Sequence, residues 1–191
     1  SWCAYDNADC PSGRSYSPIA GDGLANQCVE VPDAGLADAA VDAPDLSVVA
    51  GVTMGGNHTC AWTAGGEAYC WGANASGELG DNTTVGHLVP RFVPGLLDVV
   101  ALDAGGAYTC ALRVDGTASC WGNNVFGQLG DGSNVNRLQP TLVPNLSGVR
   151  QLIGGGGHTC ALLNTGTAQS WGANFYGQLG DGGNSDSSTP R

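Results

Sequence analysis

An internal repeat of 50 residues is the feature that most constrains how this chain can fold. Shifting the 191-residue sequence by 50 positions superposes WGANASGELGD at 71–81, WGNNVFGQLGD at 121–131 and WGANFYGQLGD at 171–181 without a gap. The Gly-Gly doublets and the Thr-Cys-Ala triplets superpose in the same register. Stacked copies of one supersecondary unit bury a core that a single copy cannot bury alone. The repeat therefore predicts a modular, stacked architecture.

The repeat divides the chain into three copies and a different N-terminal part. We expect propeller-type repeats over residues 46–191, with the copies at about 42–91, 92–141 and 142–191. Residues 1–31 are predicted to form a Cys-containing segment, and residues 32–45, PDAGLADAAVDAPD, to be an Ala/Asp/Pro-rich linker. Residues 1–45 carry eight acidic residues against one arginine, so the N-terminal part is an acidic appendage.

Each copy has the pattern of short strands. HTCAW and EAYCWG flank a Gly-rich turn, an apolar run such as LLDVVAL precedes the Gly-Gly doublet, and a short run such as RFVP lies between copies. No segment shows helical periodicity over ten or more residues. Four short strands in 50 residues predict an all-β fold of propeller-type blades, each built of four short antiparallel strands.

The combined pattern G-G-x-H-T-C-A-L followed by W-G-x-N-x-x-G-Q-L-G-D-G resembles the repeat of the regulator-of-chromosome-condensation family. The resemblance covers residues 42–191, and the stretch CAYDNADCPSG adds a similarity to small Cys-rich modules of bacterial secreted proteins. A kelch repeat has a similar length and a Gly-Gly doublet but lacks the W-G-x-N block. The resemblance implies a β-propeller, most often seven-bladed, with four-stranded blades around a central channel.

The residues that recur in every copy have predicted structural roles. A large aromatic and a leucine at the same place in each copy favour packing between adjacent blades; these residues are Trp71, Trp121, Trp171, Leu79, Leu129 and Leu179. The asparagine and aspartate of the block, such as Asn74 and Asp81, are typical of tight turns. One carboxylate per copy falls short of the six to eight oxygens that calcium takes, so we predict no metal site.

The cysteines predict disulfides. Cys60 lies ten residues before Cys70, and Cys110 ten before Cys120, so each pair spans a hairpin turn and is predicted to form a bridge. The third copy has Cys160 opposite Ser170. Cys3, Cys10, Cys28 and Cys160 remain, and we hypothesise that all eight cysteines pair, with one N-terminal cysteine reaching Cys160. Because disulfides persist in oxidising compartments, we expect an extracellular or cell-surface protein.

Composition excludes several functions. The chain has no lysine and a net charge of −11, which argues against nucleic-acid binding, and no apolar run approaches the roughly 20 residues of a membrane helix. His58 and His158 occupy one repeat position, where the middle copy has Tyr108, so this position is a poor candidate for a general base. No serine lies in a nucleophile-elbow context. We predict no enzyme, no catalytic residue and no cofactor.

Two sets of surface residues are candidates for modification or binding. The Asn-x-Ser/Thr pattern marks Asn57, Asn74, Asn82 and Asn145 as candidate glycosylation sites of a secreted glycoprotein. Phe126, Phe175 and Tyr176 follow the Trp-Gly dipeptides and are candidate partner contacts, with packing between blades as the alternative.

Three blades are too few to close a propeller, and the third copy is expected to lack its last strand. The chain is then a fragment of a longer propeller, or several chains close one ring, or each chain donates a strand to the next to give a filament. Residues 28–36, CVEVPDAGL, resemble RFVPGLLDV and are a candidate donated strand.

These observations predict a non-enzymatic extracellular structural protein that self-assembles, as a filament or a ring, through β-strand complementation between subunits. Its main partners are then copies of itself. The alternative is a secreted protein-binding module, of inhibitor or receptor type, that uses its blade loops. Family members include exchange factors for small GTPases and inhibitors of β-lactamases; the exchange-factor role fits poorly with paired cysteines.

Overall fold

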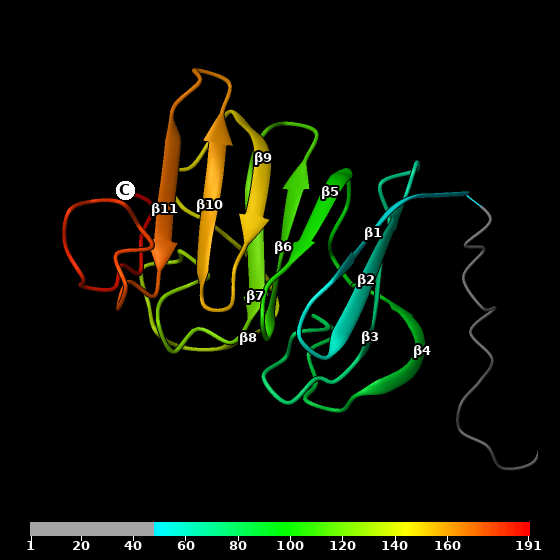
Figure 1. The fold of residues 1–191 in the computed structure, drawn as a ribbon. Helices are drawn as coiled ribbons and strands as arrows, with labels where there is room; N and C mark the ends of the chain where they lie inside the picture. Colours follow the sequence, from blue (N-terminus) through cyan, green and yellow to red (C-terminus); the bar gives the residue numbers. More distant parts are fainter. Residues whose placement is uncertain (1–47) are drawn as a thin grey trace, which may run out of the picture. The chain divides into compact units, whose positions relative to one another are not determined.

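The computed structural model describes residues 48–191 and folds the three copies into three antiparallel sheets (Figure 1). The predictions for Cys3, Cys10, Cys28, the linker and the candidate donated strand fall outside these residues. Blade 1 contains β1 (Val49–Met54), β2 (His58–Thr63), β3 (Ala68–Gly72) and β4 (His87–Phe92). Blade 2 contains β5 (Val99–Ala104), β6 (Tyr108–Arg113), β7 (Ala118–Gly122) and β8 (Arg137–Leu142). Blade 3 contains β9 (Val149–Gly154), β10 (His158–Leu163) and β11 (Ala168–Gly172).

The strands of each blade pair in chain order, so the predicted all-β blades are confirmed. The second and third strands join in a hairpin whose glycine, Gly66 in blade 1, has a φ of 82° that suits a residue without a side chain. The first strands of blades 2 and 3 begin at Val99 and Val149, later than the apolar runs predicted. Leu96 and Leu146 precede these strands and are buried in the connecting turn, so they serve the core without belonging to a strand.

Blade 3 is a sheet of three strands, so the prediction that the third copy lacks its last strand is confirmed. Along the outer edge of β11, Ser170 exchanges two backbone hydrogen bonds with Arg191, and Gly172 forms an isolated bridge with Ser187. The same registers hold β4 against β3 and β8 against β7. Residues 187–191 therefore occupy the first part of the fourth-strand position.

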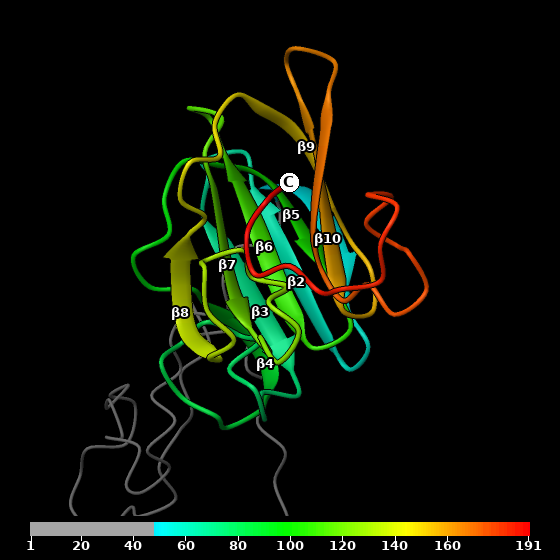
Figure 2. The same ribbon diagram turned by 90° about the vertical axis from the view of Figure 1, so that its left-hand side faces the viewer.

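The core lies between the blades, which Figure 2 shows one behind another. One buried cluster joins the disulfide, Leu79, Val93 and Leu96 of blade 1 to the strands of blade 2, and an equivalent cluster joins blade 2 to blade 3. The sheets of blades 1 and 2 therefore each bury one face against the following sheet. In the part of the chain from residue 48 onward, no helix is long and apolar enough to cross a lipid bilayer.

Candidate functional site

The loop after each Trp-Gly dipeptide is held by a buried asparagine. In blade 2, Asn124 Oδ1 accepts a hydrogen bond from the Leu129 amide at 2.9 Å, and its Nδ2 donates to Asp131 Oδ1 at 3.1 Å. Asn74 and Asn174 make the equivalent contacts in their own blades. These repeated bonds fix the loops as rigid platforms on one side of the blade stack.

The aspartate of each loop also binds a basic side chain at its own blade's outer edge. Asp81 accepts from His87 Nε2 at 2.8 Å, Asp131 pairs with Arg137 at 2.7 Å, and Asp181 pairs with Arg191. Hydrogen bonds from Thr83 and His87 outweigh partial burial and lower the pKa of Asp81. These contacts support the predicted turn role of the aspartates, and they tether residues 187–191 to blade 3.

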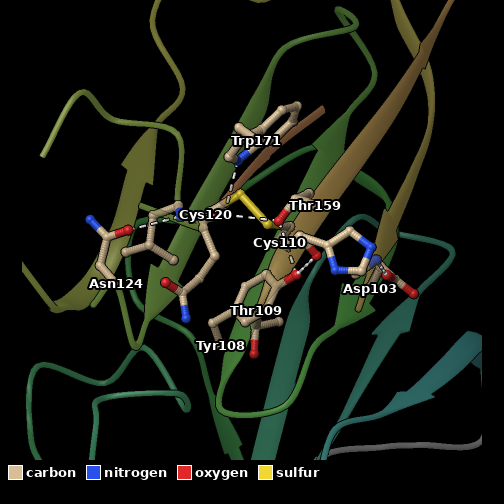
Figure 3. Close-up of a disulfide and its surroundings, with 12 residues drawn as sticks. Asp103, Tyr108, Thr109, Cys110, Cys120, Asn124, Thr159 and Trp171 are labelled. Atoms are coloured by element: carbon tan, nitrogen blue, oxygen red, sulfur yellow. Dashed lines mark hydrogen bonds between the residues drawn. A yellow bond between two sulfur atoms is a disulfide. The ribbon is translucent and has the colours of Figure 1, made fainter. Parts of the chain in front are cut away.

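Trp121 and Trp171 each form a hydrogen bond to the preceding blade. Trp121 is fully buried and donates its indole Nε1–H to the Glu78 carbonyl of blade 1 at 2.9 Å, and Thr109 Oγ1 donates to the same oxygen at 2.9 Å. Trp171 and Thr159 repeat both bonds to the Gln128 carbonyl of blade 2. Figure 3 shows Trp171 and Thr159 beside the disulfide of blade 2.

The disulfides lie in these interfaces. Cys60–Cys70 and Cys110–Cys120 are both bridged, each with a Cα–Cα distance of 4.1 Å, and they face the following blade. In blade 3, Cys160 pairs in the same register with Ser170 and carries a free thiol, whose pKa burial raises. Its predicted N-terminal partners lie outside the described residues, and that pairing stays a prediction.

The histidine position of the repeat also lies between blades. His58 is buried, and its Nε2 lies 2.8 Å from Thr109 Oγ1, while its Nδ1 has no hydrogen-bond partner among residues 48–191. Burial lowers the pKa of His58, against a smaller opposing effect of Glu78. Tyr108, its counterpart in blade 2, donates to the His158 carbonyl. The position acts as an inter-blade contact.

No residue of the described range 48–191 packs as a further blade on the interface side of blade 3. We call this surface the C-terminal end face: Cys160, Gly166, Ala168, Gln178, Leu179 and Gly180. Ala168 and Gly180 are exposed, whereas their counterparts in blades 1 and 2 are buried. A hollow of about 390 Å³ opens here, lined by most of these residues together with Ser170 and Arg191.

Among residues 48–191, nothing packs on the opposite side of blade 1. We call this surface the N-terminal end face: Val49, Val52, Met54, Thr59 and Trp71. Val52 is 61% exposed, whereas Leu102 and Leu152, its counterparts, are 5% and 7% exposed. Trp71 and Thr59 are partly exposed, whereas the same residues of blades 2 and 3 are fully buried.

A third candidate surface consists of aromatic side chains on the loops. Phe126 of blade 2 and Phe175 of blade 3 pack edge to face with their ring centres 5.3 Å apart. Phe126 is partly buried, Phe175 is 59% exposed and Tyr176 is 92% exposed. We call Phe126, Phe175 and Tyr176 the aromatic patch. Its phenylalanines pack against each other between blades, and Phe175 and Tyr176 are also exposed.

The candidate glycosylation sites divide by burial. Asn57, Asn82 and Asn145 are exposed. Asn74 is buried, and its amide nitrogen donates to Asp81 and to the Val85 carbonyl, which leaves no room for a glycan in the folded blade. Among residues 48–191, no three His, Cys, Asp or Glu side chains gather as metal ligands would.

Comparisons with known proteins agree with the repeat. The family model for the regulator of chromosome condensation (RCC1) repeat matches residues 65–112 and 115–162, and a second model of this repeat matches 49–78, 99–128 and 149–178. None of the curated proteins compared with the chain matches it.

Solved structures show the same architecture. The chain is similar to human WBSCR16, at 28% identity and a TM-score of 0.67, over 75% of this chain and 39% of that one. It is also similar to Prp20p of Saccharomyces cerevisiae, at 22% identity and a TM-score of 0.67, over 74% of this chain and 37% of that one. The chain spans less than two-fifths of the length of these relatives. With one repeat model alone matching half of its residues, the chain belongs to the RCC1 repeat family.

Proposed function

We propose that this chain is a non-enzymatic extracellular protein that binds other proteins, and copies of itself first, through surfaces of its RCC1-type blades. The observation that carries the proposal is the pair of uncovered end faces. Both expose residues whose counterparts fill the inter-blade cores, such as Val52 on one side and Ala168 on the other. Uncovered apolar faces of this kind mark protein-interaction surfaces.

Face-to-face stacking fits the molecule better than donation of an outer strand. Residues 187–191 already pair along β11 where a donated strand was expected. The outer strands β4 and β8 carry Pro90 and Pro140, and proline at a sheet edge opposes the addition of another strand. Assembly would therefore add blades to the ends of the stack and leave the outer edges free.

Two further observations support the class of function. The two disulfides lie in the blade cores, which suits an oxidising, extracellular environment. Yeast Prp20p, whose fold this chain shares, binds Gsp1p and histones, so protein binding is a function that this architecture supports.

The aromatic patch supports a second candidate function, the binding of a different protein. Phe175 and Tyr176 are exposed on loops that the buried Asn174 holds rigid. Exposed aromatic side chains on a rigid platform are typical of binding hot spots.

Sedimentation velocity of the full chain over a wide range of concentration tests the proposal. We expect the weight-average mass to rise with concentration. A Phe175→Ala variant should associate as the wild type does, because Phe175 packs against Phe126 on the side of blade 3 that faces blade 2. A wild-type chain that stays monomeric throughout would refute self-association, and loss of association in the Phe175→Ala variant would assign it to the aromatic patch.

A further inference from the structure

The two interfaces inside the chain define what a blade needs in order to dock on another. In both, a tryptophan and a threonine of the later blade donate to one carbonyl of the earlier blade, Glu78 in the first case and Gln128 in the second. In both, the first strand of the later blade donates a backbone N–H to the hairpin glycine of the earlier one. Val99 donates to Gly66 at 3.1 Å and Val149 to Gly116 at 3.0 Å.

The C-terminal end face presents the same two acceptors, without a donor from residues 48–191. Gln178 and Gly166 occupy the repeat positions of these two acceptors, and within residues 48–191 neither carbonyl receives the inter-blade bond of its counterparts. The space beside Gly180, which corresponds to the space that an indole ring fills beside Gly80 and Gly130, is also free of residues 48–191. A Cβ added to Gly80 or Gly130 would lie 2.7 Å from the indole nitrogen of the next blade, whereas a Cβ on Gly180 would meet nothing within 4 Å.

The N-terminal end face presents the matching donors. Trp71, Thr59 and Val49 occupy the repeat positions of the three donors, and within the described part of the chain Trp71 Nε1 has no hydrogen-bond partner. Val52 stands where Leu102 and Leu152 enter the inter-blade cores. The N-terminal end face therefore carries the hydrogen-bond donors that match the acceptors of the C-terminal end face.

We infer that the N-terminal end face of a second copy docks on the C-terminal end face of the first, with the second copy's Trp71 seated over Gly180 and bonded to the Gln178 carbonyl. The inference deepens the proposed self-association by naming its two faces. The complex continues the inter-blade geometry already present twice in the chain, so it requires no new kind of contact. Because the two faces differ, the contact is head to tail and each copy keeps one free face.

A complementation experiment tests this directly in the full chain. Val52→Glu disables the N-terminal end face, and Ala168→Glu disables the C-terminal end face; both residues are exposed, so folding is preserved. We expect each variant alone to be monomeric in sedimentation velocity. An equimolar mixture should form a one-to-one dimer that grows no further, because each variant keeps one intact face.

Two controls make the result specific. Val114→Glu introduces the same charge at a residue of blade 2 that is 72% exposed and outside both end faces, and it should associate as the wild type does. Trp71→Phe keeps a ring but loses the indole N–H, and it should weaken association by about threefold to tenfold, the effect of one hydrogen bond.

The outcomes separate this inference from the proposed function. If both charge variants still self-associate as the wild type does, self-association stands and head-to-tail docking is overturned. If the mixture of the two variants stays monomeric, head-to-tail docking is overturned as well. If the wild type itself never associates, both proposals fall together.

Discussion

Blade 2 and blade 3 are near-copies in sequence and differ in what covers them. In blade 2, β7 is buried along its whole length, because blade 1 lies on one side and blade 3 on the other. In blade 3, β11 begins at the exposed Ala168 and becomes buried only at Trp171 and Gly172. The burial of a residue in this fold is therefore set by the neighbouring blade, and only indirectly by the residue's own sheet.

The largest expected effect contrasts a tryptophan inside an interface with one at an end face. Trp121→Ala removes a fully buried side chain and leaves the Glu78 carbonyl without its indole donor, so we expect it to lower the free energy of unfolding by about 3–5 kcal/mol. Trp71→Ala removes a partly exposed side chain and should cost much less. Denaturant midpoints followed by circular dichroism measure both. Equal losses would contradict the assignment of Trp71 to an uncovered face.

The second prediction gives blade 3 the disulfide of the other blades. Cys160 and Ser170 pair in the register of Cys110 and Cys120, so Ser170→Cys should form a third bridge across the same hairpin. Closing a loop of this length is worth about 2.5 kcal/mol in the chain-entropy model. Thiol titration and denaturant midpoints with and without reductant measure the effect. Ser170→Ala, which loses the same hydroxyl, is the matched control, and two thiols that remain free in the Ser170→Cys variant would show that the blades differ in backbone geometry.

The smallest effect concerns the acid sensitivity of the first interface. Because burial lowers the pKa of His58 below its usual value of 6.5, only the unfolded chain takes up this proton readily as the pH falls below that value. The contribution of neutral His58 to stability is thus complete above 6.5 and is lost in acid. His58→Tyr, which copies Tyr108 of the next interface, should lose less stability between about pH 8 and about pH 5. Parallel losses in the two proteins, measured by denaturant midpoints, would refute this.

Much of the architecture could be predicted from the sequence because the repeat is exact in length. The 50-residue period gave the number of blades, and the ten-residue Cys spacing gave both disulfides, since both depend on local hairpin geometry. The three-stranded sheet of blade 3 was also predicted correctly. The pairing of residues 187–191 with β11 was not predicted: Pro190 and Arg191 match Pro90 and Arg91, but Ser187–Thr189 differ from β4 and β8, and the backbone bonds and the contact of Arg191 with Asp181 are visible only in the structure.

By itself, the sequence determined that the protein is a stack of RCC1-type β blades, because strand period, turn glycines and cysteine spacing are local properties repeated three times. Only the tertiary structure decided which of the repeated residues are buried. The sequence has the same Trp-Gly dipeptide in each copy, at Trp71, Trp121 and Trp171. Trp71 lies on the N-terminal end face and is partly exposed, whereas the other two are fully buried between blades. Burial depends on what lies opposite a side chain, and in a stack of repeats the end copies lack that neighbour on one side.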